Sequence, residues 1–115
     1  MAFRIRDSGG GAYWAGGALQ DKDGTVRNLP PAEVRFTPLR RWRSPRTGIE
    51  YPVAFNVVAG YVDITLEPLL DDQELDSRAS VGTVYWEGGV RAFAGGREVG
   101  RGYLELTGYG SALKL

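Results

Sequence analysis

Glycine and proline punctuate this chain at short intervals, and their spacing restricts the folds that it can adopt. The 115 residues include 17 glycines and 6 prolines, which separate short segments of alternating apolar and polar residues. Alternation with a period of two is typical of strands that bury one face. The clearest example is Val62, Ile64 and Leu66, each followed by a polar residue. Because no segment shows a long helical period, the pattern predicts an all-β fold of eight or nine strands.

Short connections between so many strands also limit how the sheet edges are hidden. A chain of this length is expected to form one domain over residues 1–115. An antiparallel meander that closes into a barrel has no unpaired edge, whereas a sandwich, our second choice, keeps some. We therefore expect a single antiparallel β-barrel, whose interior holds side chains or one small ligand.

Composition excludes several kinds of chemistry. Cysteine and histidine are both absent, which excludes disulfides, thiolate nucleophiles, His-dependent triads and the common zinc sites. Basic and acidic residues number 14 each, so no overall charge favours nucleic acid. No apolar run approaches the ~20 residues of a membrane helix, and the first residues lack the layout of a signal peptide. We expect no metal, no cofactor, no nucleic-acid partner and, by default, a cytoplasmic protein.

Two charged clusters have simple structural interpretations. Four arginines between positions 40 and 46 surround Trp42, a mixture that superficially resembles a nucleic-acid patch. Since the net charge is zero, we instead expect solvated arginines at a strand end and one packed tryptophan. The acidic residues between 71 and 76 are expected to form a solvated loop rather than a cation site.

The last predicted hairpin carries the candidate catalytic residues. Tyr85 and Glu87 share one face of its first strand and Trp86 lies on the other, while Tyr103 and Glu105 share a face of the second strand. If the aliphatic and tryptophan face fills the interior, the glutamates point toward solvent or a partner, and we prefer this arrangement for packing. If the tyrosine face points inward, two carboxyl groups lie in an aromatic cavity and either is a candidate acid.

Four motifs between residues 42 and 109 resemble a known family. They are residues 42–52 (WRSPRTGIEYP), 70–74 (LDDQE), 85–88 (YWEG) and 102–109 (GYLELTGY). In this order they resemble the carboxy-terminal lipocalin-like domain of the carotenoid 1,2-hydratase (hydroxyneurosporene synthase) and AttH-like family. Residues 1–29 also resemble the hairpin that precedes this region in the family.

This resemblance implies a calycin-type, lipocalin-like barrel that is equivalent to the second of two barrels. The family's ligand site lies at or between the barrels, and its histidine-bearing aromatic segments have no counterpart here. An enzyme of this kind would be a cofactor-free hydro-lyase (an alkene hydratase) or a pericyclase-type cyclase. Glu87 or Glu105 would then supply the proton.

Three functions therefore remain open for this sequence. The first is a barrel that binds a hydrophobic small molecule, isoprenoid-like or polyketide-like. The second is the enzyme just described, and the third is a structural domain that packs on an upstream barrel or forms a homodimer through its tyrosine–glutamate face. The candidate ligand-binding residues are Tyr85, Trp86, Tyr103, Trp14 and Phe55.

Overall fold

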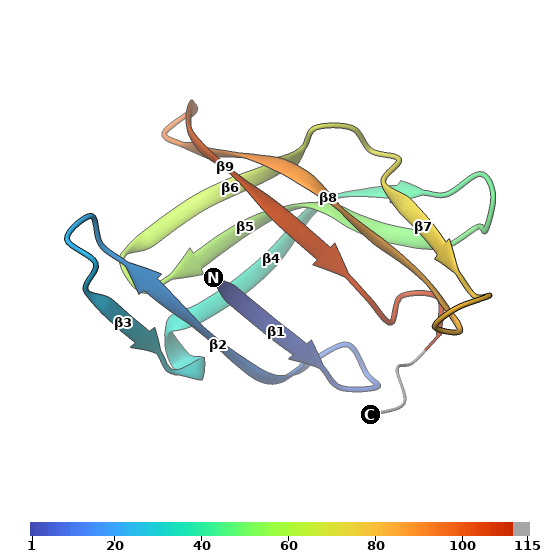
Figure 1. Cartoon of the computed structure of the whole chain (residues 1–115), viewed down its shortest axis with the longest axis horizontal. Coiled ribbons are helices and arrows are strands. Elements are labelled where there is room, and N and C mark those ends of the chain that lie inside the picture. Colours follow the sequence, from blue (N-terminus) through green and yellow to red (C-terminus); the bar gives the residue numbers. More distant parts are fainter. Residues whose placement is uncertain (112–115) are drawn as a thin grey trace. The chain divides into compact units, whose positions relative to one another are not determined.

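The computed structural model describes residues 1–111 and is built from strands joined by short connections (Figure 1). The described elements are β1 (Ala2–Arg6), β2 (Ala12–Gln20), β3 (Val26–Leu29), the single 3-10 turn η1 (Pro31–Glu33), β4 (Val34–Arg43), β5 (Glu50–Ala59), β6 (Val62–Pro68), β7 (Glu74–Ser77), β8 (Thr83–Ala94) and β9 (Arg97–Leu106). The prediction of an all-β chain with eight or nine strands is confirmed. Within these residues there is no helix with the length and apolar character needed to traverse a bilayer.

The strands pair as two antiparallel sheets. β1, β2 and β3 form a three-stranded sheet in that order. The second sheet has the order β4-β5-β6-β8-β7, and β9 also pairs with β8. The pairings found among residues 1–111 include none that closes a ring, so the closed barrel stays a prediction.

The chain divides into two compact units. The N-terminal unit comprises Met1–Thr37 and Asn56–Ile64, and the C-terminal unit comprises Pro38–Phe55 and Thr65–Leu115. β4, β5 and β6 therefore each contribute residues to both units. That residues 1–115 act as one domain stays a prediction.

The N-terminal unit has a small core on one face of the β1-β2-β3 sheet. Its buried members are Ala15, Leu29, Val34 and Ala59, with Ala2, Leu19 and Phe36 packed against them. Arg4 lies on the same face, where its guanidinium stacks on the Phe36 ring at 5.9 Å from the centroid. Because β1 alternates, Phe3 and Ile5 are left on the opposite face.

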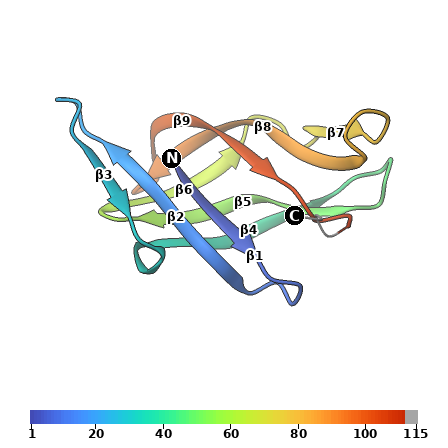
Figure 2. The same ribbon diagram turned by 60° about the horizontal axis from the view of Figure 1, so that its bottom comes forward.

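The hairpin formed by β8 and β9 (Figure 2) contributes much of the core of the C-terminal unit. Trp86, Val90 and Ala92 of β8 are buried, and Leu104 and Leu106 of β9 are buried beside them. The other residues of β9 are exposed. The arrangement that we preferred, with the aliphatic and tryptophan face inward, is thus confirmed by burial.

Gln73 fastens the loop that precedes β7 onto β8. Its side-chain Nε2 donates to the Gly89 carbonyl at 3.1 Å, and its Oε1 accepts from the Gly89 amide at 3.1 Å. A Cβ added at Gly88 would overlap the Gln73 amide group. Glycine at 88 is therefore what lets the Gln73 side chain lie against the strand.

Replacing Gly88→Ala should lower the free energy of unfolding by about 2 kcal/mol, because the new methyl group displaces Gln73 and breaks two hydrogen bonds. Urea denaturation followed by tryptophan fluorescence measures the effect. The matched control is Gly100→Ala in β9, where an added Cβ meets nothing within 4 Å, and a change within about 0.5 kcal/mol is expected. Equal effects at both positions would contradict this account of Gly88.

Candidate functional site

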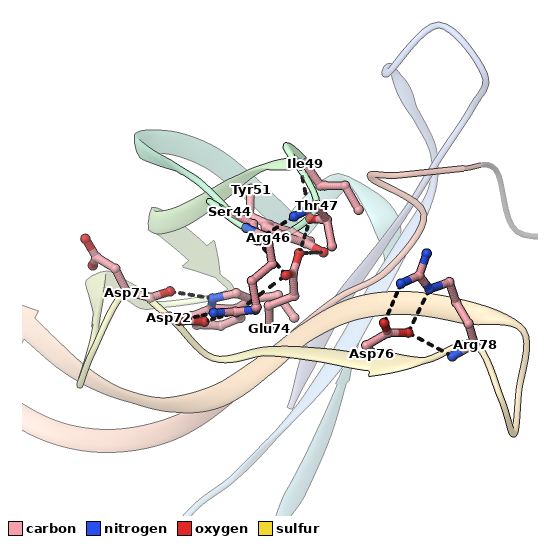
Figure 3. A network of polar contacts seen from close by, with 11 residues as sticks. Ser44, Arg46, Thr47, Ile49, Tyr51, Asp71, Asp72, Glu74, Asp76 and Arg78 are labelled. Atoms are coloured by element: carbon pink, nitrogen blue, oxygen red, sulfur yellow. Dashed lines mark hydrogen bonds and ion pairs between the residues drawn. The ribbon is translucent and has the colours of Figure 1, made fainter.

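Glu74, the first residue of β7, is a buried carboxylate in the C-terminal unit, with a side chain that is 2% exposed. It accepts hydrogen bonds from Ser44 Oγ at 2.6 Å, Thr47 Oγ1 at 2.7 Å and Tyr51 OH at 2.9 Å (Figure 3). Arg46 Nη2 lies 3.5 Å from Glu74 Oε1. Both carboxylate oxygens are therefore occupied by donors from the loop after β4 and from the start of β5.

The loop that supplies these donors is folded by its own sequence. Ser44 is buried, and its Oγ accepts from the amides of Arg46 at 3.2 Å and Thr47 at 3.3 Å. The Gly48 amide donates to the Ser44 carbonyl at 2.9 Å, and Gly48 has a φ of +73°, a conformation that glycine adopts without strain. One serine thus caps the turn and also donates to Glu74.

The charges of this network settle its protonation. Burial raises the pKa of Glu74, but the hydrogen bonds from Ser44, Thr47 and Tyr51 and the charge of Arg46 outweigh burial, so the pKa lies below its usual value. Burial, and then the bond to Glu74, raises the pKa of Tyr51. At neutral pH Glu74 is thus ionised and Tyr51 is protonated. With its oxygens saturated, Glu74 suits a structural role better than proton transfer.

Two of the arginines at 40–46, Arg40 and Arg46, pair with acidic residues at 67–74, whereas Arg41 and Arg43 pair with Glu50. Arg40 donates to Asp71 at 2.9 Å and to Glu67 at 3.0 Å. Arg46 forms a two-pronged pair with Asp72, with its Nη1 at 2.6 Å from Asp72 Oδ2. The paired side chains remain exposed to solvent, as expected, but the two clusters are also linked through Arg40 and Arg46, a pairing that the sequence signals only through their opposite signs.

The central aromatic residue of the arginine cluster is packed, as expected. Trp42 stacks on Tyr51, with ring centroids 6.3 Å apart and planes inclined by 19°. Among residues 1–111 no group of three or more acidic side chains lies close enough to hold a metal ion. This region therefore consists of ion pairs and stacked rings.

Four of the predicted site residues do come together, on the outward face of the β8–β9 hairpin. Glu87 and Glu105 are direct cross-strand neighbours. Tyr85 OH donates to Glu87 Oε1 at 3.2 Å. Partial burial, and then the charge of Glu87, raises the pKa of Tyr103, although 69% of Tyr103 is exposed. We call these four residues the tyrosine–glutamate face.

The other three predicted residues lie elsewhere. Trp86 points to the opposite face of β8, where it is fully buried and its Nε1 donates to the Asp71 carbonyl at 2.7 Å. Phe55 is buried in the C-terminal unit, and Trp14 is exposed on β2 of the N-terminal unit. Trp86 therefore anchors the acidic loop and does not join Tyr85 and Tyr103 in one aromatic shelter.

Comparison with known proteins places this fold. A model of the family described as AttH-like matches residues 1–109. The chain belongs to the AttH-like family. The crystal structure of a Nitrosomonas europaea protein assigned as AttH is 52% identical and superposes with a TM-score of 0.88 over 95% of this chain. This AttH-like chain spans only 34% of the length of that protein. A search of curated proteins found no match.

Substituting Glu74→Gln should lower the free energy of unfolding at pH 7 by about 2 kcal/mol, because three hydroxyl donors lose a charged acceptor. Chemical denaturation measures this loss. The matched control is Glu98→Gln on β9, whose side chain is 42% exposed, where a change within about 0.5 kcal/mol is expected. A loss at Glu74 no larger than at Glu98 would refute the structural role.

The same pair of proteins has a pH signature. Because folding lowers the pKa of Glu74 below its usual 4.5, its contribution to stability is present above pH 4.5 and is lost as the pH falls through the folded-state value. The stability gap between the wild type and Glu74→Gln should therefore shrink as the pH falls below 4.5. Denaturation curves collected across this range measure the gap, and a constant gap would be inconsistent with the lowered pKa.

Proposed function

We propose that this AttH-like chain binds a hydrophobic small molecule through an apolar face of its N-terminal unit. Ile5 is the cross-strand partner of Trp14 in the β1–β2 ladder, and Phe3 is two residues from Ile5 on the same face. The exposed fractions of Phe3, Ile5 and Trp14 are 38%, 40% and 53%. Three large apolar side chains left open on one face of one ladder are the observation that carries this proposal.

The local geometry of this apolar face suits a flat, hydrocarbon-rich ligand. Phe3 is paired with Gly16, and a Cβ at that glycine would lie 3.1 Å from Phe3 Cζ. The missing side chain thus lets the Phe3 ring lie close to the sheet. Two aromatic rings and one branched side chain favour an isoprenoid-like or polyketide-like molecule, which is bound by burial of apolar area rather than by charge.

A second candidate is a structural module that packs against another domain. It is favoured by the 34% coverage of the Nitrosomonas europaea protein, which leaves room for a further barrel in a relative of that length. In this proposal the chain is equivalent to one of two lipocalin-like domains, as in carotenoid 1,2-hydratases. Binding of the purified chain to the remainder of that AttH protein, measured by calorimetry, tests this role.

Catalysis receives less support from the geometry. Glu105 is exposed to solvent, whereas protonation of an alkene needs a carboxyl group in a dry pocket. Glu87 is half-buried and already accepts a hydrogen bond from Tyr85. The acid roles of Glu87 and Glu105, and hence hydro-lyase activity, stay predictions.

The binding proposal predicts that Trp14→Ala weakens the affinity for N-phenyl-1-naphthylamine, a neutral apolar dye, by about tenfold, because an aromatic contact is removed from the apolar face. Dye fluorescence in a titration measures the dissociation constant. The matched control is Tyr61→Ala, an exposed aromatic residue in the turn between β5 and β6, for which affinity should stay within about twofold. Absence of dye binding to the wild type, or equal losses in both variants, would sink the proposal.

A further inference from the structure

The outward face of the β8–β9 hairpin has an ordered charge pattern that continues beyond the tyrosine–glutamate face. Its consecutive cross-strand pairs are Glu87 with Glu105, Gly89 with Tyr103, and Arg91 with Arg101. One end of the face thus carries two carboxylates and the other end two guanidinium groups. Like charges placed directly opposite each other are unfavourable in a sheet, so neither pair is explained by the stability of this hairpin.

Three of these four charges have no ion-pair partner within residues 1–111. Glu87, Glu105 and Arg91 take part in no salt bridge there, and Arg101 reaches only Glu98 of its own strand, at 3.5 Å. Arg91 lies cross-strand to Glu67 of β6, but the Glu67 carboxylate pairs with Arg40. Glu105, Arg91 and Arg101 are exposed, and Glu87 is half-buried. The face therefore offers charges of both signs to a partner.

An apolar centre separates the two charged ends. A Cβ at Gly89 would lie 2.7 Å from Leu69 Cδ1, so the Leu69 side chain lies over Gly89 on this face. Leu69 is 46% exposed and Tyr103 is 69% exposed. An apolar, tyrosine-containing centre with charged groups around it is the usual anatomy of a protein–protein interface.

We propose that this face binds a second copy of the chain across a two-fold axis that passes near Gly89 and Tyr103. A half-turn about that axis exchanges the ends of the face, so the glutamates of each copy meet the arginines of the other. The two ends are four residues apart, or about 13 Å along a strand, and this spacing matches itself in the rotated copy. A surface that complements itself in this way is what a closed symmetric dimer requires.

Charge complementarity is what selects this occupant. A partner of one sign would satisfy one end of the face and repel the other, whereas a second copy satisfies both ends with the same spacing. The proposal does not depend on ligand binding, which was assigned to Phe3, Ile5 and Trp14 in the N-terminal unit. Failure of dye binding and failure of dimerisation are therefore separate results.

Sedimentation equilibrium of the whole chain tests the proposal. The wild type should form a dimer that weakens as the salt concentration rises, because its contacts are partly ionic. Arg91→Glu and Glu87→Arg should each weaken the dimer by about tenfold or more, since each replaces two attractions by two repulsions. The control is Lys22→Glu, which makes the same change of charge as Arg91→Glu but lies in the turn between β2 and β3. This variant should dimerise as the wild type does.

Two further samples keep the test decisive even if one variant is poorly folded. The double variant E87R/R91E exchanges the ends of the face and should regain the wild-type dimer constant within about threefold. An equimolar mixture of the R91E and E87R chains should form a heterodimer, because each copy then carries what the other lacks. A monomeric wild type would mean that the face serves another partner and would overturn the proposal, as would a double variant or a mixture that stays monomeric.

Discussion

The C-terminal unit depends on a charge that has been taken out of water. The Glu74 carboxylate receives donors from residues 23 to 30 positions earlier in the chain, so one buried group joins β7 to β5 and to the loop after β4. Without these donors its burial would cost several kcal/mol. No buried side-chain nitrogen or oxygen in the described part of the chain lacks a hydrogen-bond partner. Ser44 is an example, because its hydroxyl group donates to Glu74 and accepts from two backbone amides.

Four acidic residues of the C-terminal unit consequently illustrate two kinds of environment. Glu74 is buried among Arg46 and three hydroxyl donors and holds the fold, and Asp72 pairs with the same arginine at the exposed side of the network. Glu87 and Glu105 face each other across two strands without a cation in the described structure. The first kind supports the sheet, and the second carries the proposed dimer contact. Both kinds hold the same type of side chain, a carboxylate, so the number of hydrogen-bond donors around each carboxylate distinguishes the two kinds.

Local periodicity explains which features could be predicted from the sequence. Strand content and the inward position of Trp86 follow from alternation within one or two strands, and both are confirmed. The burial of Glu74 was missed because it depends on hydroxyl groups far away in the chain, and alternation carries no information about such partners. Alternation also explains why Trp86 and Tyr103, both candidate ligand-binding residues, lie on opposite faces of one hairpin.

The segment between β6 and β7 grips β8 from two sides. Leu69 covers the outward surface at Gly89, and Gln73 occupies the inward surface at Gly88. Because Gly88 and Gly89 have no side chains, Gln73 and Leu69 can pack directly against the two faces of β8. Displacement of residues 69–73 would therefore disturb the packing on the inward face and on the outward face of β8 together. The same segment also accepts the Trp86 Nε1 hydrogen bond at the Asp71 carbonyl, so one short loop contacts both faces of the hairpin.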